Sequence, residues 1–499
     1  MDELARALAE LGFELVSSGG TASFLAEHGL EVTTVESVTQ APELLGGRVK
    51  TLHPRIHAGI LARLDRDDDR AQLAEQAIEP FELVCVNLYP FSSAARRPDA
   101  AEDEVIELID VGGPSLLRAA AKNFAHVTVL SGPEQFEAVL GELREHGATT
   151  LQTRRRLAAA AFAATAAYDA EIAAWFADPG DHRASLTLSF EKVADLAYGE
   201  NPHQTAAYYR ERGARIHLMS RVEQLGGREL SYNNLADLEG ARRVSDDFDE
   251  PTAVIVKHGG PCGVAVAATI DEAWERALAA DPVSAFGCVA VLNRPVEEPL
   301  GSRIAGHFVE VLLAPGFSDD ALAALRTKKA LRILADYERR AEAPGERDYT
   351  RVLGGLLVQD RDRDLQDPAS MHVACGALDA AQWEDVLFAW RVCRHVRSNA
   401  IVIARDRQTI GIGAGQMSRV DAVRLAIDKA RELGHELPGS VLASDAFFPF
   451  ADGPQLALDA GVSVIVQPGG SRRDEEVTEA IRSTGGAALV LTGRRHFRH

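Results

Sequence analysis

Short apolar runs alternate with helical patterns along the first third of the chain. The runs at 13–17, 83–89 and 126–130 are typical of buried strands, and the longest helical pattern is an alanine-rich segment over 151–177. Strands separated by helices predict an α/β domain with a parallel sheet that is covered on both faces. Ligands on such sheets usually bind beyond the carboxyl ends of the strands.

The same alternation continues through the rest of the chain. The pattern predicts further strands and helices at 253–257, 270–280, 287–293, 381–396, 400–404, 418–433, 462–467 and 487–491. The best linker candidate is Asp178-Pro179-Gly180-Asp181-His182-Arg183. We therefore predict a boundary near residue 188, with one domain over 1–188 and a region over 189–499 that has room for two α/β layers of similar size.

Composition narrows the possible functions. The chain has 499 residues, enough for two or three domains, and its net charge of −21 disfavours nucleic-acid binding. Its five cysteines form no Cys-x-x-Cys pair and its histidines no His-Glu-x-x-His group, so we expect no bound metal. No run of eighteen apolar residues occurs, and the first residues lack the basic start of a signal peptide. These features predict a cytoplasmic protein that does not enter a membrane.

Two motifs in the first domain suit a phosphorylated substrate. The string GRVKTLHP at 47–54 places two cations and a hydroxyl beside a backbone turn. Ser18-Gly19-Gly20-Thr21 follows a predicted strand and opens a helix, where backbone amides can bind an anion. A simple strand-to-helix turn capped by Thr21 is the alternative interpretation, and the cations of the first string favour the phosphate site.

A third motif suits proton transfer. Lys257-His258-Gly259-Gly260-Pro261-Cys262-Gly263 follows the apolar run 253–256 directly, and histidine titrates near neutral pH. In the first domain, Tyr89 and Lys122 also stand close to predicted strands, although a core tyrosine and a solvated lysine are the alternatives. Two unlike sites on one chain predict two reactions.

Further motifs follow in order along the chain. Together they are SGGT, GRVKTLHP, NLYPF, IDVGGPSLLRAAAKN, LAYGENPHQ, VIVKHGGPCG, DPVSAFG, RSNAIVIA, GIGAGQMSR, SDAFFPF and RRHFRH. This set resembles the bifunctional purine biosynthesis protein family over essentially the whole chain. The resemblance implies transfer of a formyl group from 10-formyltetrahydrofolate to 5-aminoimidazole-4-carboxamide ribonucleotide (AICAR). Formyl-AICAR would then be cyclised to inosine monophosphate (IMP) with loss of water.

For residues 1–188 the resemblance implies an IMP cyclohydrolase on a methylglyoxal-synthase-like fold. Lys122 and Tyr89 match the positions that carry catalysis in the family, and the reaction needs no metal or redox cofactor. The implied nucleotide contacts are Ser18, Gly19, Gly20, Thr21, Arg48, Val49, Lys50, Thr51, Val86, Asn87, Asp110 and Val111.

For residues 189–499 the resemblance implies an AICAR formyltransferase built from two cytidine-deaminase-like subdomains without the deaminase zinc. His258 matches the catalytic base and Lys257 assists it electrostatically. The implied AICAR contacts are Tyr198, Gly287, Asn399, Arg419, Phe447 and Arg495, and the implied folate contacts are Val420, Ser471 and Arg472. The implied partners are AICAR, formyl-AICAR, IMP, folate and a second copy of the chain, in a homodimer with the transferase site at its interface.

Two departures from the family pattern stand out. Ala197 replaces the arginine that precedes Tyr-Gly-x-Asn-Pro-His-Gln in the family, so we expect weaker AICAR binding or another compensating cation. Family members also carry a strand and a Ser-Val-Ser-Asp-Lys-Thr-Gly loop ahead of the helix on which Met1 falls here. We expect that the first strand is missing because the start codon lies further upstream. The alternative is a formyltransferase whose cyclohydrolase domain is impaired.

Two competing hypotheses come from other classes of protein. A zinc nucleoside deaminase is suggested by Pro261-Cys262, but the remaining zinc ligands are absent from the sequence. A nucleotide-binding regulatory protein is suggested by Ala197 and by the start of the chain. The deaminase would contain zinc, and the regulatory protein would bind nucleotide without turnover.

Overall fold

The structure is a computed structural model. It describes residues 1–499 except 43, 98, 178–181, 213, 215–216, 337–345 and 364–366. Two compact units make up the chain: Met1–Glu191 with Glu211–Gly213, and Lys192–Arg210 with Ala214–His499. Residues 178–181 of the predicted linker lie outside the described residues.

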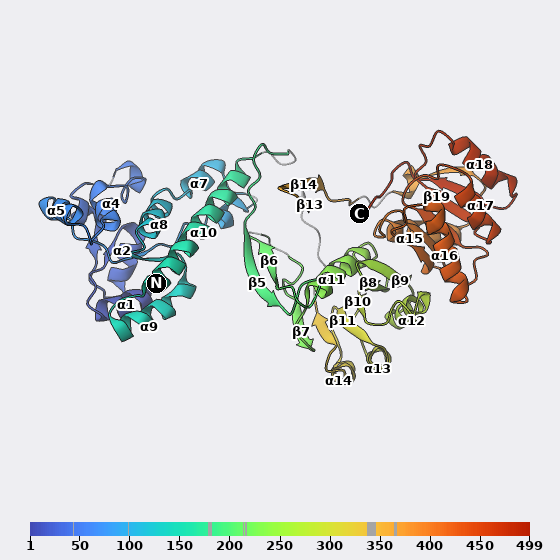
Figure 1. The fold of residues 1–499 in the computed structure, drawn as a ribbon, viewed down its shortest axis with the longest axis horizontal. Coiled ribbons are helices and arrows are strands. Elements are labelled where there is room, and N and C mark those ends of the chain that lie inside the picture. The colour runs from blue at the N-terminus through green and yellow to red at the C-terminus, as the bar shows by residue number, and fades with distance from the viewer. Residues whose placement is uncertain are drawn as a thin grey trace. The chain divides into compact units, whose positions relative to one another are not determined.

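The first unit combines short strands with helices (Figure 1). Its main elements are α1 (Asp2–Glu10), β1 (Val16–Ser17), α2 (Gly19–Glu27), β2 (Thr33–Thr34), α3 (Val35–Thr39), α4 (Pro54–Leu61), α5 (Asp67–Glu75), β3 (Leu83–Cys85), α6 (Phe91–Ala95), α7 (Glu102–Glu107), α8 (Gly112–Lys122), β4 (Thr128–Leu130), α9 (Phe136–His146) and α10 (Leu151–Trp175).

The strands of this unit pair in parallel, as the sequence predicted. β1 pairs with β2 and β3 pairs with β4, and among the described residues these pairs are two separate two-stranded sheets. The strands are shorter than predicted. β3 ends at Cys85, and one more ladder bond joins Val86 N to Leu130 O at 3.0 Å before the chain turns toward Pro90, whose nitrogen carries no hydrogen to donate.

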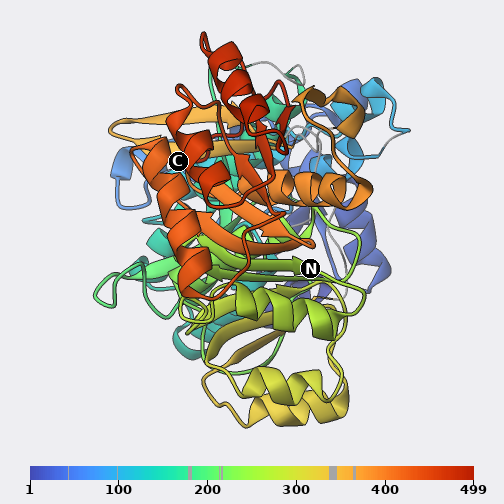
Figure 2. The ribbon, with the colours of Figure 1, turned by 90° about the vertical axis from the view of Figure 1, so that its right-hand side faces the viewer.

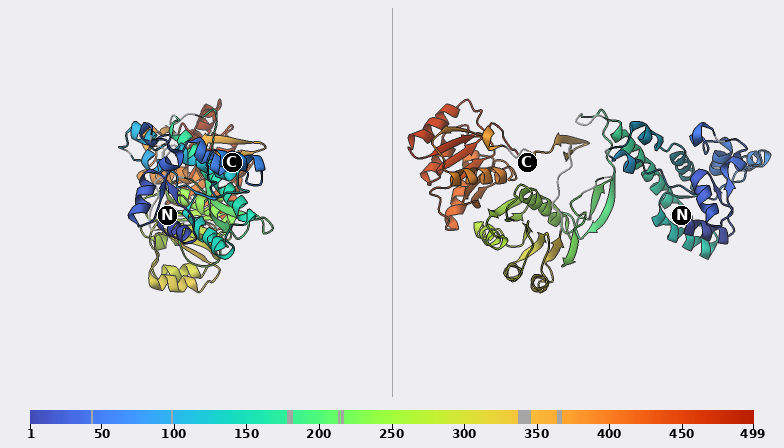
Figure 3. Two further views of the ribbon diagram at one scale, coloured as in Figure 1. Left: turned by 90° about the vertical axis from the view of Figure 1, so that its left-hand side faces the viewer. Right: turned by 180° about the vertical axis from the view of Figure 1, so that it is seen from behind.

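The helix α10 is long and apolar enough, by length and composition, to cross a membrane. It instead packs on α8 and β4 in the first unit, where it is the long teal helix of Figure 3. Leu157, Ala158 and Ala161 are buried in the same apolar cluster as Leu117 and Val129. One face of α10 is therefore part of the apolar core of this unit.

The second unit is larger and built around strands. Its elements are β5 (Phe190–Leu196), β6 (Ala206–Glu211), β7 (Glu223–Gly226), α11 (Tyr232–Ser245), β8 (Thr252–Lys257), β9 (Gly260–Val266), α12 (Ile270–Ala280), β10 (Cys288–Leu292), α13 (Leu300–Ala305), β11 (Val309–Ala314), α14 (Asp319–Arg326), β12 (Arg332–Ala335), β13 (Arg347–Val352), β14 (Gly355–Asp360), β15 (His372–Cys375), α15 (Ala380–Cys393), β16 (Ile401–Arg405), β17 (Gln408–Gly413), α16 (Arg419–Glu432), β18 (Val441–Ser444), α17 (Asp452–Asp459), β19 (Val464–Gln467), α18 (Asp474–Ser483) and β20 (Ala488–Leu491).

One mixed sheet of twelve strands forms the framework of this unit. Its order is β15-β20-β19-β18-β16-β17-β9-β8-β10-β11-β12-β7. The two halves meet where β17 pairs antiparallel with β9 at Gln408 and Ala265, and Figure 2 shows the green and orange strands side by side. Apolar clusters line both faces of the sheet, which explains why central strands such as β8 and β16 are nearly continuous apolar runs.

The two halves of the sheet repeat one order of elements. The first half runs β7-α11-β8-β9-α12-β10-α13-β11-α14-β12, and the second runs β15-α15-β16-β17-α16-β18-α17-β19-α18-β20. In both halves a hairpin (β8–β9 or β16–β17) is followed by an antiparallel strand, two parallel strands and an antiparallel edge strand. The hairpins β8–β9 and β16–β17 therefore occupy equivalent places in the two halves.

Candidate active sites

A cavity of about 1020 Å³ in the first unit collects most of the predicted nucleotide contacts. It is lined by the ends of β1 and β3, by the start of α2 and by the segment that leads into α8. The predicted residues that line it are Ser18, Gly20, Thr21, Arg48, Lys50, Thr51, Val86, Asn87, Tyr89, Asp110 and Val111. The predicted residues Gly19 and Val49 do not line the cavity, although their chain neighbours do.

The start of α2 forms one wall of this cavity. Ser18 is the N-cap residue in an extended conformation, and Gly19 follows with a φ of 51°, which favours glycine. A Cβ placed on Gly19 would lie 2.7 Å from Lys50 Nζ, so the lysine ammonium lies against the helix N-terminus. A helix N-terminus beside a lysine is suited to bind a phosphate.

Two carboxylates also line this cavity. Glu107, which the sequence analysis did not single out, forms an ion pair with Arg48, and this pair raises the pKa of Arg48. Asp110 accepts a hydrogen bond from Gly113 N at 2.8 Å at the start of α8, and its own N–H donates to Tyr168 Oη at 2.8 Å. These contacts fix Asp110 at the edge of the cavity. A bound phosphate would compete with Glu107 for Arg48.

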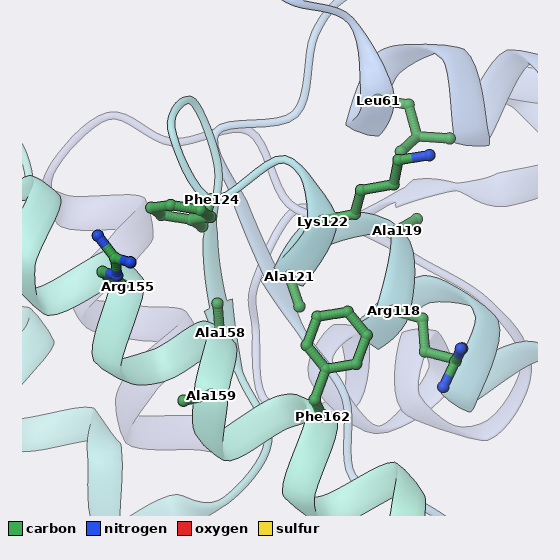
Figure 4. Close-up of a pocket in the computed structure, with 10 residues that line it drawn as sticks. All are labelled: Leu61, Arg118, Ala119, Ala121, Lys122, Phe124, Arg155, Ala158, Ala159 and Phe162. Carbon is green, nitrogen blue, oxygen red and sulfur yellow. The ribbon is translucent and has the colours of Figure 1, made fainter.

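The structure does not bring Lys122 into this cavity. Lys122 is the last residue of α8 and lines a separate hollow of about 560 Å³, which it shares with Arg118, Arg155 and Phe162 (Figure 4). The helix is eleven residues long, which corresponds to about 16 Å between its ends. Within one chain, Lys122 is therefore remote from the residues at the start of α8.

The second site lies at the turn between β8 and β9. Lys257 is the last residue of β8, and its Nζ donates to the carbonyl oxygens of Phe286 at 2.8 Å and of Gly287 at 2.5 Å. His258 follows in the turn with an exposed side chain and a φ of 52°. The predicted residues Lys257, His258 and Gly287 are thus brought together by two different strands, β8 and β10.

A second group of predicted residues gathers around Arg419 at the start of α16. Arg419 Nη2 donates to Asn399 Oδ1 at 2.7 Å, and Nη1 donates to Ser444 Oγ at 2.8 Å and forms an ion pair with the fully buried Asp445. Asp445 was not among the predicted site residues, although it lies in the SDAFFPF motif. The carboxylate holds Arg419 in place and leaves Nη2 to orient Asn399.

The C-terminal segment connects these two groups. Ser398 N donates to the carbonyl oxygen of Arg498 at 2.9 Å, which places the last residues beside the 397–399 segment. A Cβ on Gly259 would lie 3.6 Å from Arg397 Nη2, so this segment also reaches the β8–β9 turn. Arg397 and Arg498 are cations near the turn that the sequence analysis did not identify.

The other predicted residues of the second unit lie on several elements. Tyr198 accepts a hydrogen bond from Tyr232 N at 3.1 Å through its carbonyl oxygen, and Phe447, just after β18, is 38% exposed. The Arg495 guanidinium lies 4.5 Å from the Phe497 ring centre. Val420 follows Arg419 in α16. Ser471 and Arg472 lie in the glycine-containing loop before α18, where Ser471 N donates to Asp474 Oδ1 at 3.2 Å.

Across the part of the chain that the structure describes, no group of three or more His, Cys, Asp or Glu residues could hold a metal ion. Cys262, the residue that suggested a zinc deaminase, lies in β9, and burial raises the pKa of its thiol to about 12. A protonated thiol is a poor metal ligand.

Two family models match successive parts of the chain. The family described as "MGS-like domain" matches residues 1–115, and the family described as "AICARFT/IMPCHase bienzyme" matches residues 120–429. A solved structure titled "Crystal structure of ForH" is 40% identical, covers 35% of this chain and 92% of that chain, and has a TM-score of 0.32, too low to bear on the fold.

Curated relatives match over nearly their full length. Proteins named "Bifunctional purine biosynthesis protein PurH" are 46% identical in Anoxybacillus flavithermus, 47% in Halalkalibacterium halodurans and 48% in Acidithiobacillus ferrooxidans. Each alignment covers at least 99% of this chain and 96% of the relative. These matches give no support to the alternative of an impaired cyclohydrolase. The chain belongs to the AICARFT/IMPCHase bienzyme family, with an MGS-like domain at its N-terminus.

Proposed function

We propose that this protein transfers a formyl group from 10-formyltetrahydrofolate to AICAR and then cyclises formyl-AICAR to IMP with loss of water. Membership of the bienzyme family supports both activities. The observation that carries the proposal is the separation of the predicted residues into two sites, one in each compact unit. We assign cyclisation to residues 1–188 and formyl transfer to 189–499.

Formyl transfer requires a base, because the aromatic amine of AICAR must lose a proton as it attacks the formyl carbon. His258 is exposed at the β8–β9 turn and takes this proton, which then passes to the folate nitrogen as the carbon–nitrogen bond to the donor breaks. Lys257, held by the carbonyls of Phe286 and Gly287, supplies positive charge near the developing oxyanion. Asn399 and Arg419 bind the substrate, and their mutual hydrogen bond at 2.7 Å supports a shared role.

The remaining contacts follow the motif match. Tyr198, Phe447 and Arg495 bind AICAR, with Phe447 stacking on the flat ring. Val420, Ser471 and Arg472 bind the folate. The transferase site lies at the interface of a homodimer in the cytoplasm, and the repeated element order of the two sheet halves supports two related deaminase-like subdomains.

Cyclisation requires attack of the carboxamide nitrogen on the formyl carbon, followed by loss of water. The start of α2, with Lys50 beside Gly19, binds the nucleotide phosphate, and Arg48 and Thr51 contribute further donors. Tyr89 lines the same cavity and handles protons during ring closure. We assign Lys122 a catalytic role from the motif match alone. Within one chain, the hollow that Lys122 lines is separate from the nucleotide cavity.

The proposal is tested by incubating the protein with AICAR and 10-formyltetrahydrofolate and separating the products by chromatography. We expect formyl-AICAR to form first and IMP to follow. Binding of AICAR without turnover would favour the regulatory protein, and deamination that depends on zinc would favour the deaminase. Accumulation of formyl-AICAR without IMP would show that only the formyltransferase is active.

A further inference from the structure

One carboxylate anchors the turn that carries His258. Asp237 lies on α11 and accepts a hydrogen bond from Gly259 N at 2.6 Å. The same carboxylate also faces the backbone N–H of His258 and interacts electrostatically with the His258 and Lys257 side chains. Burial raises the pKa of Asp237 in spite of these favourable contacts. The turn is thus held by a partly desolvated acid directly beside the proposed base.

The other half of the sheet contains the same anchor. Asp385 on α15 accepts hydrogen bonds from Asp406 N at 2.8 Å and from Arg407 N at 2.6 Å in the β16–β17 turn. Asp237 and Asp385 occupy the same place in their helices, since each is the sixth residue, of α11 and of α15 respectively. Burial raises the pKa of Asp385 as well.

The two turns also share their backbone conformation. His258 and Gly259 have φ values of 52° and 79°, and Asp406 and Arg407 have 53° and 55°. Two consecutive residues with positive φ are typical of a type I′ hairpin turn, in which non-glycine residues are strained. The repeated carboxylate stabilises this conformation in both halves. Holding the turn is therefore the shared role, and it does not by itself distinguish the half that carries His258.

The charged groups near His258 distinguish the β8–β9 turn from the β16–β17 turn. Among the described residues, the cations near the β8–β9 turn include Lys257 from β8, Arg397 from the segment before β16 and Arg498 from the C-terminal segment. A Cβ on Gly240 in α11 would meet Gly259 O at 3.9 Å and Arg498 Nη2 at 4.0 Å, so this arginine lies close to both α11 and the turn. These three groups are cations near the turn that carries His258. Asp237 opposes them.

We propose that Asp237 is a positioning residue for formyl transfer: its carboxylate fixes the β8–β9 turn that presents His258, and its negative charge stabilises the imidazolium formed when His258 accepts the amine proton. The proposal rests on the proposed role of His258 as the base. It assigns Asp385 a purely structural role in the equivalent turn. The two acids therefore form a matched pair within one chain, in which only one should affect the chemistry.

The test compares Asp237→Asn with Asp385→Asn in the full chain. Asparagine keeps an oxygen that accepts from the turn amides but removes the charge. In Asp237→Asn the surrounding cations are no longer opposed, so the acidic limb of the kcat–pH profile for formyl transfer should move to lower pH by about 0.5–1 unit. Asp385→Asn should leave the profile unchanged. An unshifted profile in Asp237→Asn, or an equal shift in Asp385→Asn, would overturn the proposal.

A second readout does not depend on activity. The ring protons of His258 are assigned in NMR spectra by their loss in His258→Ala, and their titration midpoint is followed in both Asn variants. We expect the midpoint to fall only in Asp237→Asn. If the wild-type protein transfers no formyl group but this midpoint still falls, the proposed function fails while the electrostatic coupling stands. An unchanged midpoint would refute the coupling whether or not the enzyme is active.

Alanine substitutions of the two aspartates measure how much each carboxylate stabilises its turn. Asp237→Ala and Asp385→Ala each remove the acceptor from a strained turn, so both should lower the melting temperature by similar amounts. Only Asp237→Ala should also lower kcat for formyl transfer, by at least tenfold, with little change in KM for AICAR. Equal loss of kcat in the two alanine variants would show that the effect comes from general destabilisation.

Discussion

At the scale of single residues, formyl transfer depends on His258. We expect His258→Ala to lower transfer by roughly two to four orders of magnitude, because the attacking amine loses its base. Cyclisation of supplied formyl-AICAR should be unchanged, since that site lies in the other unit. The control is His372→Ala, which replaces an exposed histidine on β15. Wild-type transfer by His258→Ala would rule out this assignment.

Cys262 lies in the same motif as His258, but its chemistry is different. Burial raises the pKa of its thiol to about 12, and that of Cys288 to about 12, so both are neutral thiols at pH 8. We expect alkylation of Cys262 by iodoacetamide at pH 8 to be at least tenfold slower in the folded protein than in urea, and to accelerate as pH rises. We also expect Cys262→Ala to retain formyl transfer. Rapid labelling that AICAR prevents would instead place a reactive thiol in the site.

At the scale of elements, the hairpin that carries His258 is fixed by close packing of β9 on α12. A Cβ on Gly263 would lie 2.0 Å from the carbonyl oxygen of Ala277, a backbone atom that cannot move independently. Gly263→Ala should therefore lower the free energy of unfolding by roughly 1–3 kcal/mol in urea denaturation. Gly486→Ala, where no atom lies within 4 Å, is the matched control and should change little. Equal stability of the two variants would contradict the packing.

The sequence predicted elements best where apolar patterns are long. The helix α12 has the predicted bounds of 270–280, and β8 and β16 lie within one residue of their predictions, because these elements are buried on a large sheet. The strands β1 and β3 are shorter than predicted, since apolar side chains extend beyond the paired residues, before β1 and after β3. Hydrophobic periodicity indicates which residues are buried, but it does not indicate where backbone pairing stops.

The sequence also predicted only part of the candidate sites. Motifs identified His258, Arg419 and the turn at Ser18 because each motif is continuous in the chain. Asp237 and Asp445 were missed, because each acts on a residue at least twenty positions away. Asp237 lies in a helix without an unusual pattern, and the motif around Asp445 does not show that its carboxylate pairs with Arg419. The separation of Lys122 from the cavity also requires the fold, since the sequence shows only that it ends a helix.

At the scale of the whole molecule, two sites in two units imply that the intermediate can move between molecules. Lys50→Ala should weaken nucleotide binding by about 10–100-fold, because one charge-assisted hydrogen bond is lost, and it should let formyl-AICAR accumulate. His258→Ala should form no formyl-AICAR. Mixing the two variants should restore conversion of AICAR to IMP after a lag, measured by chromatography. A mixture no better than either variant would show that both steps depend on the same site.

The central claim is that one chain adds the formyl carbon and then closes the ring with it. The most direct measurement follows a ¹³C-labelled formyl group of 10-formyltetrahydrofolate by NMR in the presence of the wild-type protein and AICAR. The label should appear first in formyl-AICAR and then in the purine ring of IMP, with one tetrahydrofolate released for each AICAR consumed. If the label stays on the folate while AICAR binds, or never enters a purine ring, the account is wrong.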